Sequence, residues 1–218
     1  MDRLMDYSEK QILIFDGVMT LLREGQPVHE LKVADITESA GIGKSTAYEY
    51  FTSKEEIIRE ALAYHLRENF RRFAAYVFSA GTFRDMIRNA LDHMEESLDG
   101  QSTGIFFMVL MEHRMQLDNG AYLDDAFRQK METMLETQIR RITAIGTEEG
   151  QIAGDLTMTE IRMILFGFFT AYIRNLMKIK LGVCGNQGGK DLKDKREQEA
   201  EISQLKDQTL KLLLKALK

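Results

Sequence analysis

The side chains best suited to chemistry lie close together in the first quarter of the chain. Lys44 carries a point charge that can bind a phosphate, and Ser45 and Thr46 carry short hydroxyls that can reach a phosphate or a base edge. Tyr48 and Tyr50 each combine an apolar ring with a hydrogen-bonding hydroxyl. This set of cation, hydroxyls and phenols fits contact with a polyanion better than covalent catalysis.

Two short helices separated by a glycine are predicted to position these side chains. Residues 33–40 form the first helix and residues 44–50 the second. Gly41 stands where a tight turn needs a residue that accepts positive φ, and Ile42 can fill the angle between the helices. This order is that of a helix-turn-helix, whose second helix enters the DNA major groove. The alternative is an ordinary helical hairpin with a solvated polar face.

The predicted DNA contacts lie on the outward face of the second helix or at a helix start. At the start of the following helix, the Lys54 ammonium and the free backbone N–H groups could hold another phosphate. The full predicted set is Lys32, Thr37, Gly43, Lys44, Ser45, Thr46, Tyr48, Tyr50 and Lys54.

A recognisable pattern runs through this segment, made of Asp35-Ile36, Ala40-Gly41-Ile42, Tyr48, Tyr50-Phe51 and Ser53-Lys54-Glu55. With these features, residues 33–54 closely resemble the DNA-binding signature of the TetR family of transcriptional regulators. Three residues depart from the usual pattern: Gly43 replaces a common serine, Ser45 a common glycine, and Ala47 a larger aliphatic residue. The resemblance implies a homodimeric regulator with a ligand site in the later helices and a long connector helix that carries ligand-driven motion.

The composition favours an all-α, soluble globular protein. The 218 residues are 44% apolar and 29% charged, and the only proline is Pro27. No alternating Val/Thr-rich run predicts a sheet. A net charge of −5 excludes an argument from overall basicity, so DNA binding would depend on a few placed cations and helix N-termini. Cys184 is the only cysteine, which favours a reducing cytoplasm, and no segment is apolar over the length that a membrane span needs.

Helical periodicity and capping residues divide the chain into two domains. We expect a helix-turn-helix DNA-binding domain over residues 1–53 and a helical ligand-binding and dimerisation domain over residues 54–218. Residues 182–195 contain four glycines and are predicted to be a linker. Besides the two short helices, the predicted helices span residues 8–23, 53–78, 82–98, 122–149, 157–181 and 198–216. One more helix is expected to start after Gly104 and to end at Asn119-Gly120.

Catalytic and metal-binding patterns are weak in this sequence. The four histidines His29, His65, His93 and His113 include no pair spaced by three or four residues, and no phosphate-binding or nucleophile motif occurs. We therefore expect no catalytic residue, metal or cofactor. The alternatives to a DNA-binding regulator are an all-α protein-interaction module and a small helical enzyme.

Methionine and phenylalanine are in excess between residues 83 and 172. Such side chains line adaptable apolar pockets, but they also fill cores, and residue types alone favour a core. The resemblance implies a cavity here for a small apolar or amphipathic effector. The candidate ligand-binding residues are Met86, His93, Phe107, Met108, Met111, Glu112, Met115 and Tyr172.

The last two predicted helices carry more apolar surface than one subunit readily buries. Pairing them with their copies would give a four-helix bundle, a homodimer and a near-palindromic operator. The alternative is that the final helix folds back on its own subunit. The candidate interface residues are Ile164, Gly167, Phe168, Ala171, Leu205 and Leu212.

Overall fold

The computed structural model describes residues 7–99, 125–181 and 195–218, and every regular element in those ranges is helical. The predicted all-α class is confirmed. The described residues divide into two compact units. The head unit comprises residues 7–71 with 125–133, and the body unit comprises residues 72–99, 134–181 and 195–218.

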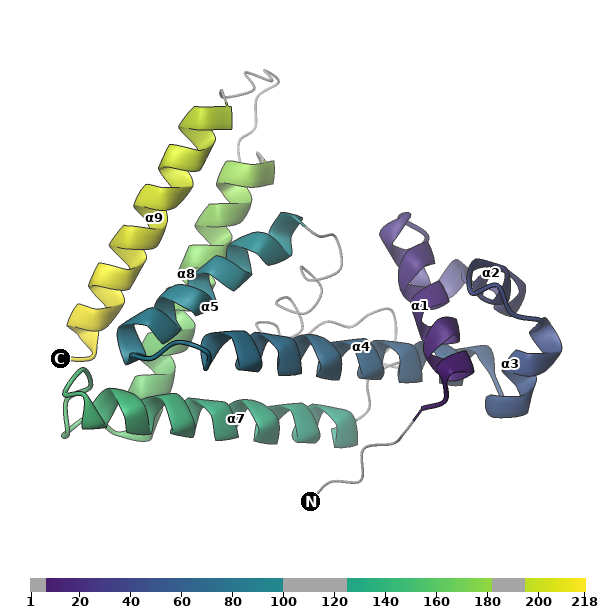
Figure 1. The fold of residues 1–218 in the computed structure, drawn as a ribbon, viewed down its shortest axis with the longest axis horizontal. Coiled ribbons are helices and arrows are strands. Elements are labelled where there is room, and N and C mark those ends of the chain that lie inside the picture. Colours follow the sequence, from purple (N-terminus) through teal and green to yellow (C-terminus); the bar gives the residue numbers. More distant parts are fainter. Residues whose placement is uncertain (1–6, 100–124, 182–194) are drawn as a thin grey trace. The chain divides into compact units, whose positions relative to one another are not determined.

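The head unit contains the predicted pair of short helices. Its first helix starts at a complete capping box, in which Ser8 N donates to Gln11 Oε1 (2.9 Å) and Gln11 N donates to Ser8 Oγ (3.4 Å). The elements are α1 (Glu9–Arg23), η1 (Val28–Glu30), α2 (Val33–Ser39), α3 (Lys44–Tyr50) and the first part of α4 (Lys54–Val77) (Figure 1).

A single apolar core holds these head helices together. Gly17 lets α1 approach α2 closely, because a Cβ built at this position would lie only 2.7 Å from the Ile36 carbonyl oxygen. The fully buried side chains of this core are Ile14, Phe15, Val18, Leu31, Ile36, Ala47, Ile57, Ile58 and Ala61.

The body unit is built mainly on α5 (Phe83–Asp99), α8 (Met158–Leu181) and α9 (Lys195–Ala216), which pack against one another. Figure 1 shows α9 running beside α8. Most of α7 (Asp125–Glu148) belongs to this unit as well. The C-terminal end of α9 is held to the segment between α7 and α8, where Ala153 N donates to Leu217 O (2.7 Å).

Helix α4 contributes residues 54–71 to the head unit and residues 72–77 to the body unit. The first turns of α4 belong with the head unit because Ile57, Ile58 and Leu62 complete the core on which α1, α2 and α3 pack. The expected boundary of the functional domains after residue 53 stays a prediction. Within the described ranges, no helix combines the length and apolar character needed to cross a membrane.

Candidate nucleic-acid interface

The turn between α2 and α3 is set by Gly41, whose φ is +65°. Gly41 N donates to Glu38 O (3.0 Å) and Ile42 N donates to Thr37 O (2.9 Å). These two bonds form a Schellman motif, which satisfies carbonyls left free at the end of α2. Ile42 packs against the head core. The open space around a Cβ at Gly41 means that backbone conformation, and not crowding, requires glycine here.

Helix α3 presents one buried face and one polar face. Ala47 is fully buried, whereas Lys44 and Ser45 are exposed. The large side chains Tyr48 and Tyr50 are 51% and 37% exposed, although aromatic residues of this size usually bury their rings. Helix α3 therefore holds a cation, a hydroxyl and two phenols on its solvent side, an arrangement that suits contact with phosphates and base edges.

Gly43 is the N-cap of α3 and makes no side-chain capping bond. Its φ of −68° is allowed for any residue, and a Cβ would meet only the Ser45 hydroxyl at 3.7 Å. The N–H groups in the first turn of α3 consequently have no side-chain cap.

Two residues of the predicted contact set differ in their access to solvent. Lys32, at the N-cap of α2, is exposed. Thr37 is buried, and its hydroxyl donates to Val33 O (2.9 Å) and Ala34 O (3.0 Å) within its own helix. Thr37 lies on the core-facing side of α2, so its hydroxyl stabilises this helix and does not reach solvent.

Lys54 joins two segments of the head unit. Its ammonium donates to His29 O (3.2 Å), in the short helix that precedes α2, and lies 4.0 Å from the Glu55 carboxylate. Its side chain is 27% exposed. The sequence separation of 25 residues explains why local pattern alone did not reveal this bond.

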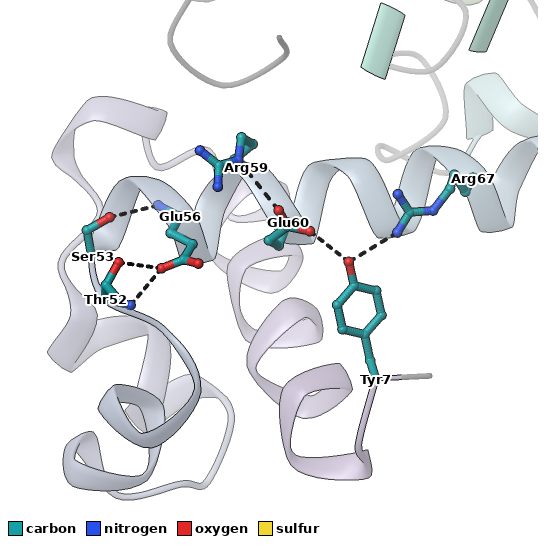
Figure 2. Close-up of polar contacts among 7 residues, drawn as sticks. All are labelled: Tyr7, Thr52, Ser53, Glu56, Arg59, Glu60 and Arg67. Atoms are coloured by element: carbon teal, nitrogen blue, oxygen red, sulfur yellow. Dashed lines mark hydrogen bonds and ion pairs between the residues drawn. The ribbon is translucent and has the colours of Figure 1, made fainter. Parts of the chain in front are cut away.

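Helix α4 begins with a modified capping box (Figure 2). Ser53 Oγ accepts from Glu56 N (3.1 Å), as the sequence predicts, but the Glu56 carboxylate accepts from the backbone N and the hydroxyl of Thr52 (both 2.6 Å). These hydrogen bonds, above all that from the Thr52 hydroxyl, lower the pKa of Glu56 below its usual value. The cap fixes the chain where α3 passes into α4.

The predicted effector residues fall into two groups. Phe107, Met108, Met111, Glu112 and Met115 lie outside the described residues. Met86 is buried on α5, and the His93 ring, also on α5, lies 5.3 Å from the Phe73 ring and 6.0 Å from the Tyr76 ring. Burial lowers the pKa of His93, which favours its neutral form.

Tyr172, one of the predicted effector residues, is a buried polar group of the body unit. Its side chain is 1% exposed, and its hydroxyl has no hydrogen-bond partner among the described residues. Burial raises the pKa of Tyr172, and the negative charges of Glu95 and Asp92 add to this effect. Thr143, on α7, also has a buried hydroxyl without a partner in the described ranges, and sequence pattern gave no signal for it. Buried hydroxyls normally pair, so these two are exceptions among the described residues.

The predicted dimer residues remain accessible in one subunit. Gly167, Ala171 and Leu212 are exposed, and Ile164, Phe168 and Leu205 are partly exposed. By contrast, the other side of α9 and the residue that follows it are buried within the subunit. These buried residues are Leu210, Leu213, Leu214 and Leu217. Helix α9 therefore does fold back on its own unit, yet it leaves part of its apolar surface uncovered.

One residue of the head unit was not singled out from the sequence. Tyr7 stands just before the Ser8 cap and packs edge-on against Phe15 and Tyr64, with ring centroids 4.8 and 5.7 Å away. The signal that could have found it is an aromatic residue immediately before a capping box, the position from which a side chain often packs on its own helix.

Comparison with known proteins agrees with this geometry. Residues 22–61, which include α2, α3 and the start of α4, match the family described as "Bacterial regulatory proteins, tetR family". No protein of curated function matches the chain by sequence.

Solved structures share the fold over nearly the whole chain. The fatty acid degradation regulator FadR from Bacillus halodurans is 16% identical, with a TM-score of 0.62 over 96% of each chain. FadR from Bacillus subtilis, solved with stearoyl-CoA, is 18% identical, with a TM-score of 0.61 over 95% of this chain and 99% of that one. The ketosteroid regulator KstR2 of Mycobacterium tuberculosis is 16% identical, with a TM-score of 0.53 over 97% and 96%. At these identities the likeness establishes the fold.

Proposed function

We propose that this chain, whose residues 22–61 match the TetR family, is a transcriptional repressor that a small apolar or amphipathic molecule releases from a near-palindromic operator. The observation that carries the DNA-binding part is the exposed polar face of α3. Tyr48 and Tyr50 face solvent there, while Ala47 anchors the same helix in the core.

The proposed DNA-contacting residues are those that reach solvent. Lys44, Ser45, Tyr48 and Tyr50 would contact the major groove and its phosphates, with Lys32 and the N-terminus of α3 at Gly43 beside them. Thr46, partly exposed, and Lys54, held by His29 O, would contribute at the edges of this surface. We leave Thr37 out of this proposal because its hydroxyl is committed to its own helix.

A binding assay on the chain's own upstream DNA tests the proposal. We expect saturable binding to one duplex, with an affinity that falls steeply as salt rises from about 50 to 200 mM because phosphate contacts release counterions. Binding to no upstream duplex above the level of a scrambled duplex would contradict it, and would favour an all-α interaction module.

The effector part is supported by two buried hydroxyls of the body unit that have no hydrogen-bond partner among the described residues. The buried hydroxyls of Tyr172 and Thr143 could orient a ligand whose remaining surface packs against apolar side chains such as Met86. Two of the similar structures bear the names of a fatty acid regulator and a ketosteroid regulator. We propose a ligand of this kind, mostly apolar with one or two polar groups.

A ligand panel tests the effector. Stearoyl-CoA, stearate and a steroid ketone would be added to the protein alone and to its operator complex. We expect one class both to raise the melting temperature and to release operator, since a ligand that prefers one conformation shifts the population toward it. If every compound leaves both properties unchanged, this ligand class is wrong for the chain.

The homodimer is supported by the uncovered apolar strip on α8 and α9. Met163 is 70% exposed and Leu212 is 53% exposed, and beside them Gly167 and Ala171 would let a second helix approach. We expect sedimentation at micromolar concentration to give a dimer, and Ala171→Glu to give a monomer of unchanged helicity. A monomeric wild-type chain would contradict the proposal.

A further inference from the structure

The Tyr7 hydroxyl is held between two charged side chains of α4. It donates to Glu60 Oε2 (2.7 Å) and accepts from Arg67 Nη2 (3.3 Å), as Figure 2 shows. Glu60 and Arg67 are seven residues apart, so they occupy the same face of α4 two turns apart. The Arg67 guanidinium also lies 5.9 Å from the Tyr7 ring centroid. A residue that precedes α1 is thereby fixed to the middle of α4.

The ring and the hydroxyl of Tyr7 have separable tasks. The ring packs on Phe15 and Tyr64, which a phenylalanine could do equally well. The hydroxyl contributes only the hydrogen bonds to Glu60 and Arg67. Burial and the hydrogen bond to Glu60 raise the pKa of Tyr7, which favours the neutral hydroxyl that donates to Glu60.

These bonds lengthen the part of α4 that is in contact with the N-terminal segment of the head unit. The apolar core holds α4 through residues 57–62. The Tyr7 contacts continue to Arg67, and the Asp16 carboxylate of α1 lies 3.3 Å from His65 Nε2 over the same stretch. From Ile57 to Arg67 the helix rises about 15 Å. Head helices that are held along that length of α4 resist tilting against it more strongly than helices held only at its first turns.

We propose that Tyr7 is a positioning residue for operator recognition, whose hydroxyl locks α1–α3 onto α4 and so restricts the spacing of half-sites that the dimer accepts. The inference rests on the proposed function, in which two copies present two recognition helices to one operator. One added base pair shifts a half-site by about 3.4 Å and rotates it by about 35°. A rigidly mounted head cannot follow that shift, whereas a loosened head can.

The test measures binding to four duplexes that contain the operator, the operator with one central base pair added, the operator with one removed, and a single half-site. Wild type should prefer the natural spacing by about 30-fold, a preference that Tyr7→Phe should reduce to about 3-fold. Half-site affinity should change by less than about 2-fold, because α3 itself is untouched.

Two further variants separate the lock from general stability. Glu60→Gln keeps an acceptor for the Tyr7 hydroxyl and should keep the spacing preference, whereas Glu60→Ala should lose it. Glu68→Gln is the matched control, since it removes an exposed ion pair with Arg71 (2.7 Å) on the same helix and should change nothing.

The outcomes distinguish the lock from the proposed function. If wild type binds none of the four duplexes, the operator-binding function fails and the lock fails with it. If wild type binds with a spacing preference that Tyr7→Phe and Glu60→Ala retain, the lock alone is overturned. An equal loss of affinity on all four duplexes would also overturn it, because Tyr7 would then only stabilise the fold.

Discussion

The head unit and the body unit use their polar side chains in opposite ways. In the head unit, the apolar residues form one closed core, and the residues proposed to bind DNA lie on its surface, as Ala47 and Tyr48 show on a single helix. In the body unit, polar groups such as the Tyr172 and Thr143 hydroxyls lie inside without partners in the described ranges. Exposed polar groups cost the fold little because water pairs with them, whereas buried polar groups without partners are costly.

A second difference concerns charge. The body unit holds Lys206 between Asp92 and Glu95, with Nζ 2.7 Å from Glu95 Oε2. Burial lowers the pKa of Lys206, but its hydrogen bonds to Asp92 and Glu95 outweigh this and leave the pKa raised. On the outward face of α3, Lys44 is exposed, so its charge is available to a phosphate. Lys206 therefore holds helices of the body unit together, whereas Lys44 of the head unit is directed outward.

The largest expected effect is on the outward face of the head. The double substitution Lys44→Ala with Tyr48→Ala should weaken operator binding about 100-fold, or about 2.8 kcal/mol, by removing a phosphate contact and a groove contact. Anisotropy titration measures the affinity, and circular dichroism should show unchanged helicity. Lys211→Ala, an exposed cation on α9, is the control and should bind as wild type does. Unchanged affinity of the double variant would remove α3 as the recognition helix.

A substitution on the buried side of the head unit should lower the free energy of unfolding. Gly17→Ala would place a Cβ 2.7 Å from the Ile36 carbonyl oxygen and 3.1 Å from the Ala40 Cβ, so α1 must move away from α2. We expect a loss of about 1–3 kcal/mol in the free energy of unfolding, measured with urea. A Cβ at Gly81 meets nothing within 4 Å, so Gly81→Ala should not destabilise the subunit. Equal effects of the two substitutions would contradict the close approach of α1 and α2.

A substitution inside the body unit should leave the free energy of unfolding unchanged or raise it. Tyr172→Phe removes a buried hydroxyl that has no partner among the described residues, so the ligand-free protein should be unchanged or stabilised by up to about 1 kcal/mol. Effector affinity should fall if this hydroxyl orients the ligand. Thermal melting with and without an active compound measures both effects. A strongly destabilised variant would show that the hydroxyl is already paired.

Acid should weaken helix caps in both units. Hydrogen bonds from Thr52 to Glu56 and from Thr157 to Glu160 lower the pKa of each carboxyl below its usual 4.5. Because the folded pKa is the lower one, the stabilisation is complete above pH 4.5 and disappears as the pH falls through the lowered value. The difference in urea midpoint between wild type and the Glu56→Gln, Glu160→Gln double variant should therefore shrink below pH 4.5. A constant difference would mean that the carboxylate charge contributes nothing.

The smallest expected effect is at the N-cap of α3. Gly43→Ser supplies a hydroxyl acceptor where φ is −68° and the cap has no side-chain bond, and should stabilise the head by a few tenths of a kcal/mol. Urea unfolding measures the gain, with Gly43→Ala as the control that adds a Cβ without an acceptor. A gain shared by both variants would assign it to backbone entropy instead of capping.

Much of the fold could be predicted because its signals are local. Ser8 with Gln11 and Thr157 with Glu160 form the complete capping boxes expected from their spacing of three residues. Gly41 ends α2 with the predicted positive φ. Each of these features depends on residues within about one helical turn, so the sequence alone specifies it.

The candidate sites were only partly predictable because burial depends on distant residues. Tyr48 and Thr37 both carry hydroxyls in the helix-turn-helix, but only the structure distinguishes the exposed Tyr48 from Thr37, whose hydroxyl bonds within α2. The bond from Lys54 to His29 O and that from Tyr7 to Glu60 join residues 25 and 53 positions apart. Periodicity carries no information on such pairs.

The sequence by itself determined the all-α class, the ends of most helices and the turn that sets α3 on α2, since these follow from backbone preferences and capping over a few residues. Only the tertiary structure decided which polar groups are enclosed, as with the hydroxyls of Thr143 and Tyr172, and where α4 joins the head core. The physical reason is that desolvation and packing arise from atoms brought together across the chain, after the local helices have formed.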